Sequence, residues 1–338
     1  MKKIALLFIA ALMVFSLFSC GNDKDILEST KTEKTVLMTV DGFDVPLELY
    51  RYVALNSKAD YEASRGGSAD IWLGESGAAL IKEINAHIND IILTMYTTRS
   101  LAAKYGISPE DEYIKDTVDI LMDNVYEGYG YDYIAYKNDL GAVNMTDSVY
   151  RFITANDLLA EELYAKLIES GEILSGEDEL RGVINSDEFV RVKQILLTSE
   201  NGNTDEENLA LAQKLLDKLA HGDSFEDLVQ KYGKDLYMFN NDNGYYICRG
   251  NRYEEFEEAA FSLEVGEVSG IIKTPAGYSI IKRYEKDSDY ITENFEDLCE
   301  EYKKGKYNLI LEEHKATITV EPTDEMKNYS IFNLDSID

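Results

Sequence analysis

Between residues 189 and 284 the sequence alternates short β-rich runs with short amphipathic helices, and this pattern most constrains the fold. The run FVRVKQILL at the start is typical of a strand, and the turn TPAG joins two β-rich runs into an antiparallel hairpin. The pattern predicts, in order, a strand at 189–197, a helix at about 205–220, a helix from Phe225 to Tyr232, a strand near 245–247, a helix at about 253–261, and strands at 268–273 and 278–284. This β-α-α-β-α-β-β order predicts a compact α+β domain.

The flanking segments are predominantly helical. A periodic apolar stripe predicts a helix at about 78–105, which Gly106 ends, and Ser108 with Pro109 begins the next helix. A third helix is expected at about 147–169. The residues predicted to face inward are Ile84, Ile88, Ile91, Met95, Thr98, Ala102 and Tyr105 in the first helix, Ile114, Val118, Leu121 and Val125 in the second, Phe152, Leu159, Leu163 and Leu167 in the third, and Leu209, Ala212, Leu216 and Leu219 in the helix at 205–220.

Two short strand-like runs lie far apart in the chain, at 36–40 and 316–320. Each would otherwise lack a partner, so we expect them to pair with each other. The helical domain is then discontinuous, with an N-terminal part at 35–188 and a C-terminal helix and strand at 285–338 that complete it. The predicted fold class is α+β: a mostly helical domain into which the domain at 189–284 is inserted.

The N-terminus has the pattern of a secretory leader. Two lysines precede an apolar run from Ile4 to Phe18, which is short for a membrane-spanning helix, and Cys20 follows a small residue at its end. This arrangement resembles a bacterial lipobox, so residues 1–20 are predicted to be a lipoprotein signal peptide and Cys20 the lipidated residue. An ordinary signal peptide with an unrelated cysteine is the alternative. The polar residues 21–34 are predicted to be a flexible tether between the lipid anchor and the fold.

The charge balance excludes some partners. The 338 residues include 64 acidic and 33 basic side chains, for a formal net charge of −31. A chain this acidic cannot neutralise phosphates along a nucleic acid, and it would be repelled by an anionic membrane surface. We therefore expect no nucleic-acid partner, and membrane attachment through lipid on Cys20 at the extracytoplasmic face of the cell membrane.

Nothing in the cysteine and histidine spacing points to a metal or a cofactor. After Cys20, Cys248 and Cys299 are the remaining cysteines, too far apart in sequence for a disulfide framework, and we expect both to be buried thiols. The histidines, His87, His221 and His314, are scattered, and none is predicted to be catalytic.

Several motifs of the α+β domain together have a specific spacing. They are FVRVKQILL at 189–197, GDSFEDL at 222–228, YGKD at 232–235, Arg249-Gly250, FEEAAFSL at 256–263, GEVS at 266–269 and TPAGYSII at 274–281. With these motifs the domain resembles a parvulin-type peptidyl-prolyl cis-trans isomerase, and the resemblance covers about 189–284. With a predicted lipidated cysteine and divided helical flanks, the whole chain is similar to extracytoplasmic foldases of the PrsA and SurA type.

The resemblance implies roles for particular residues. Phe256 stands where the family has the phenylalanine of its proline slot, Asp235 stands where the family has an aspartate or cysteine near the amide, and Thr274 matches a threonine near the turn. Such domains rotate an X–Pro bond, whose barrier of about 18–20 kcal/mol makes the uncatalysed reaction slow. The site needs an apolar slot for the proline ring and a few polar groups around the amide, and it needs no metal.

The sequence departs from the family at four single positions of this site and in a glycine-rich run, GGxLG in the family, which is Asn241-Asp242-Asn243-Gly244-Tyr245 here. The two histidines that hydrogen-bond beneath the pocket are replaced by Gln194 and Ser279. A pocket methionine is replaced by Arg252 and an aromatic residue by Ile247. Gln194 and Ser279 can donate and accept hydrogen bonds, so a neutral pair could still support the site. Arg252 needs water or a charged partner; it could pair with Asp235, or point outward and select acidic residues before proline.

A tyrosine-dense run at 126–136, YEGYGYDYIAY, has two interpretations. It could be an adhesive aromatic surface for unfolded polypeptides, or its tyrosines could pack a loop between two helices with their hydroxyls in water.

Three functional hypotheses follow. The first is a membrane-tethered foldase that holds extended polypeptides with X–Pro bonds and catalyses prolyl isomerisation, with an activity weakened by the lost histidines. The second is a chaperone whose parvulin domain is a non-catalytic peptide-binding scaffold. The third, a lipid-anchored solute-binding protein, is disfavoured because the chain lacks alternating βα units.

Overall fold

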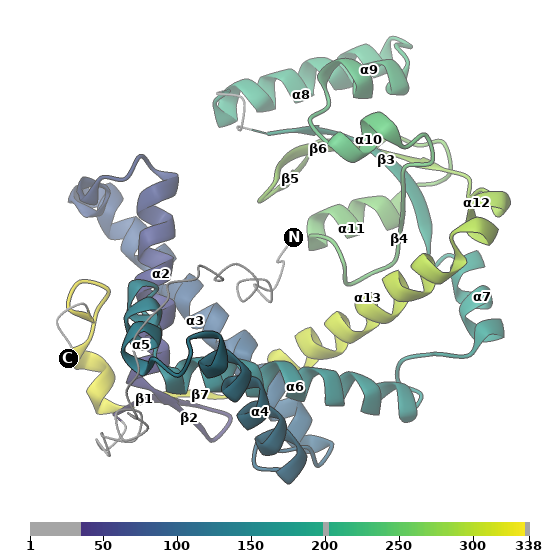
Figure 1. Cartoon of the computed structure of the whole chain (residues 1–338). Helices are drawn as coiled ribbons and strands as arrows, with labels where there is room; N and C mark the ends of the chain where they lie inside the picture. Colours follow the sequence, from purple (N-terminus) through teal and green to yellow (C-terminus); the bar gives the residue numbers. More distant parts are fainter. Residues whose placement is uncertain (1–34, 199–202, 335–338) are drawn as a thin grey trace. The chain divides into compact units, whose positions relative to one another are not determined.

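The computed structural model describes residues 35–198 and 203–334, which form two compact units (Figure 1). We call 35–166 together with 311–334 the helical unit, and 167–198 together with 203–310 the sheet unit. Each is described separately below. The helices α6 and α13 each begin in one unit and end in the other.

The helical unit is discontinuous in sequence, and a small sheet joins its two parts. Its sheet has the order β2-β1-β7, and β1 pairs with β7 in antiparallel register, with Val40 opposite Val320. The predicted pairing between the two ends of the chain is therefore confirmed, although the C-terminal strand begins at Val320 rather than at 316. The elements of this unit are β1 (Val36–Val40), β2 (Phe43–Pro46), α2 (Leu47–Ser64), η1 (Ala69–Trp72), α3 (Gly74–Lys104), α4 (Glu112–Gly128), α5 (Tyr133–Ala142), α6 (Asp147–Glu169), β7 (Val320–Pro322) and η3 (Asp324–Asn328).

The core of the helical unit lies between α2, α3 and the sheet. The face of α3 that is fully buried carries Ile84, Ile88, Ile92 and Tyr96. The predicted stripe is correct at Ile84, Ile88, Thr98 and Ala102, but Ile91 and Met95 are only partly buried. Between Ile88 and Tyr96 the buried face continues at steps of four residues, so here the buried positions are Ile92 and Tyr96 rather than the predicted Ile91 and Met95.

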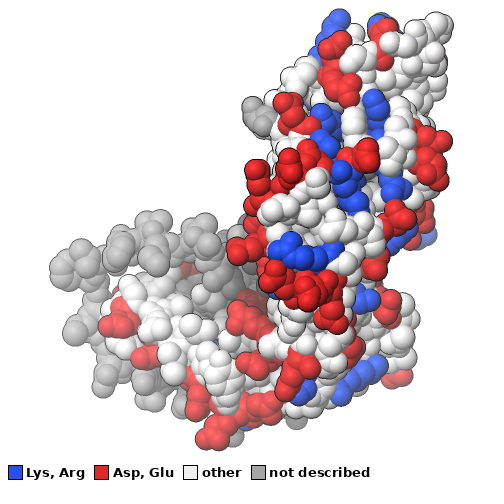
Figure 2. All heavy atoms as spheres, turned by 90° about the vertical axis from the view of Figure 1, so that its right-hand side faces the viewer, with Lys and Arg blue, Asp and Glu red and all other residues white. Residues whose placement is uncertain are grey.

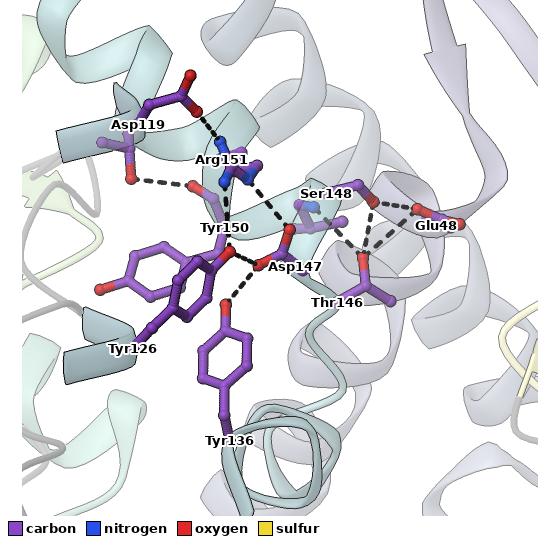
Figure 3. Close-up of polar contacts among 11 residues, drawn as sticks. Glu48, Asp119, Tyr126, Tyr136, Thr146, Asp147, Ser148, Tyr150 and Arg151 are labelled. Atoms are coloured by element: carbon purple, nitrogen blue, oxygen red, sulfur yellow. Dashed lines mark hydrogen bonds and ion pairs between the residues drawn. The ribbon is translucent and has the colours of Figure 1, made fainter. Parts of the chain in front are cut away.

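The tyrosine-dense run is mainly structural (Figure 3). Tyr126, Tyr133 and Tyr136 are buried, and the hydroxyls of Tyr126 and Tyr136 both donate to one carboxylate oxygen of Asp147, at 2.7 and 2.9 Å. The packing that the structural interpretation predicts is thus confirmed for these three tyrosines. The expectation that their hydroxyls lie in water is wrong, because those of Tyr126 and Tyr136 bind Asp147 and that of Tyr133 is buried. The expected loop is wrong, because residues from Tyr133 onward form α5, which Asp132 caps at its N-terminus.

The sheet unit contains a four-stranded antiparallel sheet in the order β4-β3-β6-β5. The hairpin at TPAG is present, with Thr274 opposite Gly277, but its first strand is shorter than predicted and Val268 makes only an isolated bridge to Lys282. The elements of this unit are α7 (Glu177–Asn185), β3 (Val190–Leu197), α8 (Asp205–Ala220), α9 (Phe225–Tyr232), α10 (Leu236–Asn240), β4 (Tyr245–Ile247), α11 (Glu254–Ser262), β5 (Ile272–Thr274), β6 (Gly277–Tyr284), α12 (Ser288–Glu293) and α13 (Phe295–Lys315).

Helices cover both faces of this sheet. Alternate residues of β3 and β6, including Ile195 and Ile280, pack against α8 and α9. The opposite set, including Val192 and Ile281, packs against α11. Because side chains alternate along a strand, Gln194 and Ser279 lie on the α11 face.

The sheet unit extends beyond 189–284 at both ends. A further apolar cluster joins α7 and Phe189 to α12 and the first turns of α13. Cys248 and Cys299 both lie in this cluster as free, buried thiols, as predicted. Burial raises the pKa of the Cys248 thiol to about 12 and also raises that of Cys299, so neither is a reactive thiolate at neutral pH.

Candidate functional site

A chain of hydrogen bonds links Gln194 and Ser279, the two residues that the resemblance places where the parvulin family has histidines. The Ser279 hydroxyl donates to Gln194 Oε1 at 2.9 Å, and Gln194 Nε2 donates to Asp235 Oδ2 at 2.6 Å. These residues come from β6, β3 and the N-cap of α10, where the other Asp235 oxygen accepts the Tyr237 backbone amide at 3.0 Å. The structure therefore brings together three predicted site residues that are 41 and 85 positions apart in sequence.

This chain is neutral except at Asp235. Gln194 uses its amide as donor to a carboxylate and its carbonyl as acceptor from a hydroxyl, so its orientation is set by both partners. Gln194 and Ser279 are buried, and neither titrates near neutral pH. The pair can hold Asp235 in place and stabilise a polar amide, but it cannot carry a proton as a histidine can.

Tyr245 is a fourth member that the sequence interpretation missed. Its hydroxyl donates to Asp235 Oδ2 at 2.8 Å, and its ring stacks on Tyr237 with centroids 4.7 Å apart. Burial, followed by the nearby Asp235 charge, raises the pKa of Tyr245, so it remains a donor. Its position after the Asn-Asp-Asn-Gly loop gave no signal, because only the fold places it beside Asp235.

Arg252 points toward α13 rather than to Asp235. Its guanidinium lies 5.2 Å from the centre of the Tyr245 ring, and its Nη1 is 3.4 Å from Glu301 Oε1. The sequence-based alternatives were a pair with Asp235 and an outward orientation into solvent, and neither describes this side chain. Glu301 supplies the carboxylate, from a helix outside the segment in which the site was expected.

Glu257, also missed, fixes the backbone that carries Arg252. This buried carboxylate accepts the amides of Gly250, Asn251 and Arg252 at distances between 2.8 and 3.0 Å. Three amides that converge on one carboxylate define a rigid loop, which we call the 249–252 loop. The first turn of α11 thus holds the loop beside the candidate site.

The other predicted binding residues lie inside the domain. Phe256 and Ile247 share one apolar cluster and are 5% and 0% exposed, so they pack the sheet beneath α11. Thr274 is buried, and its hydroxyl accepts the Ala276 amide at 3.2 Å, which stabilises the hairpin turn. Cys20 lies outside the described residues.

A second polar cluster, in the helical unit, contains a serine and a histidine. Ser100 Oγ lies 2.7 Å from His314 Nε2 and donates to Asp41, while Lys104 Nζ lies 3.2 Å from His314 Nδ1. Because a lysine ammonium only donates, Nδ1 accepts and Nε2 donates to the serine. The histidine therefore cannot act as a base toward Ser100, and the buried Ser100–His314 pair joins the last turn of α13 to α3.

The described residues contain no group of three or more His, Cys, Asp or Glu side chains arranged to hold a metal ion. None of the helices within 35–198 and 203–334 has the length and apolar composition needed to cross a membrane. On the face drawn in Figure 2, Lys and Arg side chains are interspersed with Asp and Glu and do not form one continuous basic surface.

The chain is similar in sequence to parvulin-type isomerase domains and to PrsA foldases. Residues 180–287 match the family model described as "PPIC-type PPIASE domain". The chain is 25% identical to the foldase protein PrsA of Caldanaerobacter subterraneus over 285 residues, covering 83% of this chain and 82% of that protein. It is 23% identical to PrsA of Clostridium perfringens over 96% of both chains. A solved structure of the peptidylprolyl isomerase PrsA from Bacillus anthracis has a TM-score of 0.36 and 22% identity, covering 67% of this chain and 96% of that one.

Proposed function

We propose that this chain, a relative of the PrsA foldases with a PPIC-type parvulin domain at 180–287, binds extended polypeptides outside the cytoplasm and assists their folding. The sheet unit is proposed to accelerate rotation about X–Pro bonds, with a rate lowered by the loss of both family histidines. The helical unit is proposed to hold the polypeptide.

The observation that carries this proposal is the hydrogen-bond chain Ser279–Gln194–Asp235. Rotation about a prolyl bond breaks no covalent bond, so the site has to stabilise a twisted amide rather than transfer a proton. A fixed carboxylate with neutral donors around it can orient and polarise such an amide without any change in its own protonation. Asp235 is held by Gln194 and Tyr245 in the manner this role requires.

The alternative is a parvulin scaffold that binds peptide without catalysis. It is supported by the burial of Phe256 and Ile247, and by Tyr245 and Arg252 occupying the neighbourhood of Asp235. The two functions differ in one measurable property, the rate of prolyl isomerisation.

The substitution of both histidines provides the test. Restoring them as Gln194→His with Ser279→His should raise the isomerisation rate of a prolyl peptide about tenfold or more, which corresponds to about 1.4 kcal/mol of barrier. Adding Arg252→Met should raise it further, because it restores the apolar wall of the family pocket. The rate is measured on the full chain by protease-coupled or NMR exchange assays, with circular dichroism to verify folding.

Suppression of aggregation of a proline-free client serves as the control for this experiment. It should be unchanged in the same variants, because holding is assigned to the helical unit. If the wild type already isomerises rapidly and the restored pair adds nothing, the lost histidines have not weakened the site. If neither the wild type nor the restored variant isomerises, the non-catalytic scaffold is the correct function.

Lipid attachment at Cys20 gives a prediction on location. Since Cys20 is the proposed lipid acceptor, Cys20→Ala should move the protein from the membrane fraction to the soluble extracytoplasmic fraction, as measured by fractionation and immunoblotting. Cys299→Ala is the matched control and should remain with the membrane. Unchanged membrane retention of the Cys20 variant would contradict lipid anchoring.

A further inference from the structure

The 249–252 loop is fixed from two sides. Glu257 of α11 binds its three amides from one side, as described above. On the other side lies α13, which follows the segment that matches the parvulin family model at 180–287. The site is therefore in contact with a helix that the parvulin segment does not include.

Backbone approaches backbone where α13 meets this loop. Gly250 has φ +97°, and a Cβ at this position would lie 2.2 Å from the Gly305 carbonyl oxygen. A Cβ on Gly305 would lie 2.4 Å from the Arg249 carbonyl oxygen. Only glycine at both positions permits this approach, since no larger residue can share the space with a carbonyl group.

Four hydrogen bonds close the same contact, one of which runs from Asn308 Nδ2 to Asn251 Oδ1 at 3.3 Å. Asn308 Nδ2 donates to the Gly250 carbonyl oxygen at 2.9 Å, and Asn251 Nδ2 donates to the Glu301 carbonyl oxygen at 2.6 Å. The Cys248 thiol donates to that same Glu301 carbonyl at 3.3 Å. About two turns of α13, from Glu301 to Asn308, thus fix the position of the loop.

The Glu301 side chain lies beside the guanidinium of Arg252, the last residue of this loop. Its Oε1 is 3.4 Å from Arg252 Nη1, yet that oxygen accepts no hydrogen bond among the described residues. The attraction is electrostatic without an aligned hydrogen bond, so a client carboxylate can compete for Arg252. The same guanidinium lies over Tyr245, which in turn donates to Asp235.

We propose that α13 positions the 249–252 loop through Glu301, Gly305 and Asn308, and that Glu301 sets how strongly Arg252 selects prolyl peptides with an acidic residue before proline. This selectivity rests on the proposed function of the site; the positioning of the loop does not. Arg252 and α13 together form the specificity-determining part of the site.

The first experiment tests positioning in the free full-length protein. Amide hydrogen exchange at Gly250, Asn251 and Arg252 is measured by NMR in the wild type, in Asn308→Ala and in Lys304→Ala, an exposed neighbour on the same helix. Asn308→Ala removes two hydrogen bonds to the loop, so exchange there should accelerate about fivefold. Lys304→Ala should leave it unchanged. Equal exchange in all three proteins overturns the positioning role.

The second experiment tests selectivity with a pair of peptides that carry Glu or Lys before proline. Wild type should show a lower KM for the Glu peptide. Glu301→Gln keeps the backbone acceptor and removes the competing charge, so it should widen this preference about threefold. Arg252→Met should abolish it, and Asn308→Ala should raise KM for the Glu peptide with little change in kcat.

The outcomes separate this inference from the proposed function. If the wild type isomerises both peptides and Glu301→Gln leaves their ratio unchanged, the selectivity role of Glu301 is wrong while the function stands. If no peptide is isomerised, the preference for the Glu peptide over the Lys peptide is instead calculated from their dissociation constants, measured by NMR titration. A Glu301→Gln variant with wild-type dissociation constants for both peptides then overturns the selectivity role.

Discussion

Replacing Glu257 by alanine is expected to destabilise the sheet unit by about 3 kcal/mol. The Glu257 carboxylate is buried and accepts the amides of Gly250, Asn251 and Arg252. Hydrogen bonds to a charged group are each worth about 1.5–3 kcal/mol, and buried amides without a partner carry a desolvation cost. Partial entry of water recovers some of that loss, so the expected total is smaller than three full bonds.

The measurement is urea unfolding followed by circular dichroism, with two variants for comparison. Glu257→Gln keeps one carbonyl acceptor and should lose about half as much stability. Glu258→Ala changes the exposed neighbour on the same helix and should stay within about 0.5 kcal/mol of wild type. A Glu257→Ala protein as stable as Glu258→Ala would show that the loop does not depend on this carboxylate.

Replacing Asp147 by alanine should have a similar effect on the helical unit, again about 3 kcal/mol. Asp147 accepts the hydroxyls of Tyr126 and Tyr136, and its second oxygen accepts Arg151 Nε at 3.1 Å (Figure 3). Burial, then the hydrogen bond to Asp147, raises the pKa of Tyr126 to about 12, so both tyrosines are neutral donors at pH 7. Without the carboxylate, two buried hydroxyls lose their acceptor.

The chain offers a local probe for this second experiment. Its single tryptophan, Trp72, is buried in the core of the helical unit, so its fluorescence reports unfolding of that unit. Asp147→Ala should lower the urea midpoint seen by Trp72, Asp147→Asn should lower it less because the amide oxygen still accepts, and the exposed Asp116→Ala should not move it. Coinciding midpoints for Asp147→Ala and Asp116→Ala would show that the network is not stabilising.

Local pattern was sufficient to locate most of the elements. The strand at 36–40 and the helices at 147–169 and 205–220 have the predicted bounds, because each has an uninterrupted period and definite end signals. Thr204, for example, caps α8 with a reciprocal bond to Glu207. These are interactions between residues a few positions apart, which a sequence displays directly.

The sequence predicted the positions of the helices better than it predicted which face of each helix is buried. Leu121 and Leu209 were predicted inward but are 40% and 44% exposed, while their neighbours Met122 and Asn208 are buried. Steps of three and four residues describe two adjacent helix faces almost equally well. The face that is buried is decided by the element that packs against the helix, which lies elsewhere in the chain.

The candidate site divides in the same way. A strand pattern and a family resemblance were enough to select Gln194, Asp235 and Ser279, since alternation along paired strands places such residues on one face. The partners that orient the site could not be predicted from the sequence. Glu301 lies beside Arg252, Tyr245 donates to Asp235, and Glu257 binds the 249–252 loop through its backbone amides. Sequence determines which groups a chain carries and how they repeat along it. The pairing of each charged group or hydroxyl with its partner depends on contacts between segments that are distant in sequence. At this site, those pairs were decided only by the packing of α11 and α13 around the 249–252 loop.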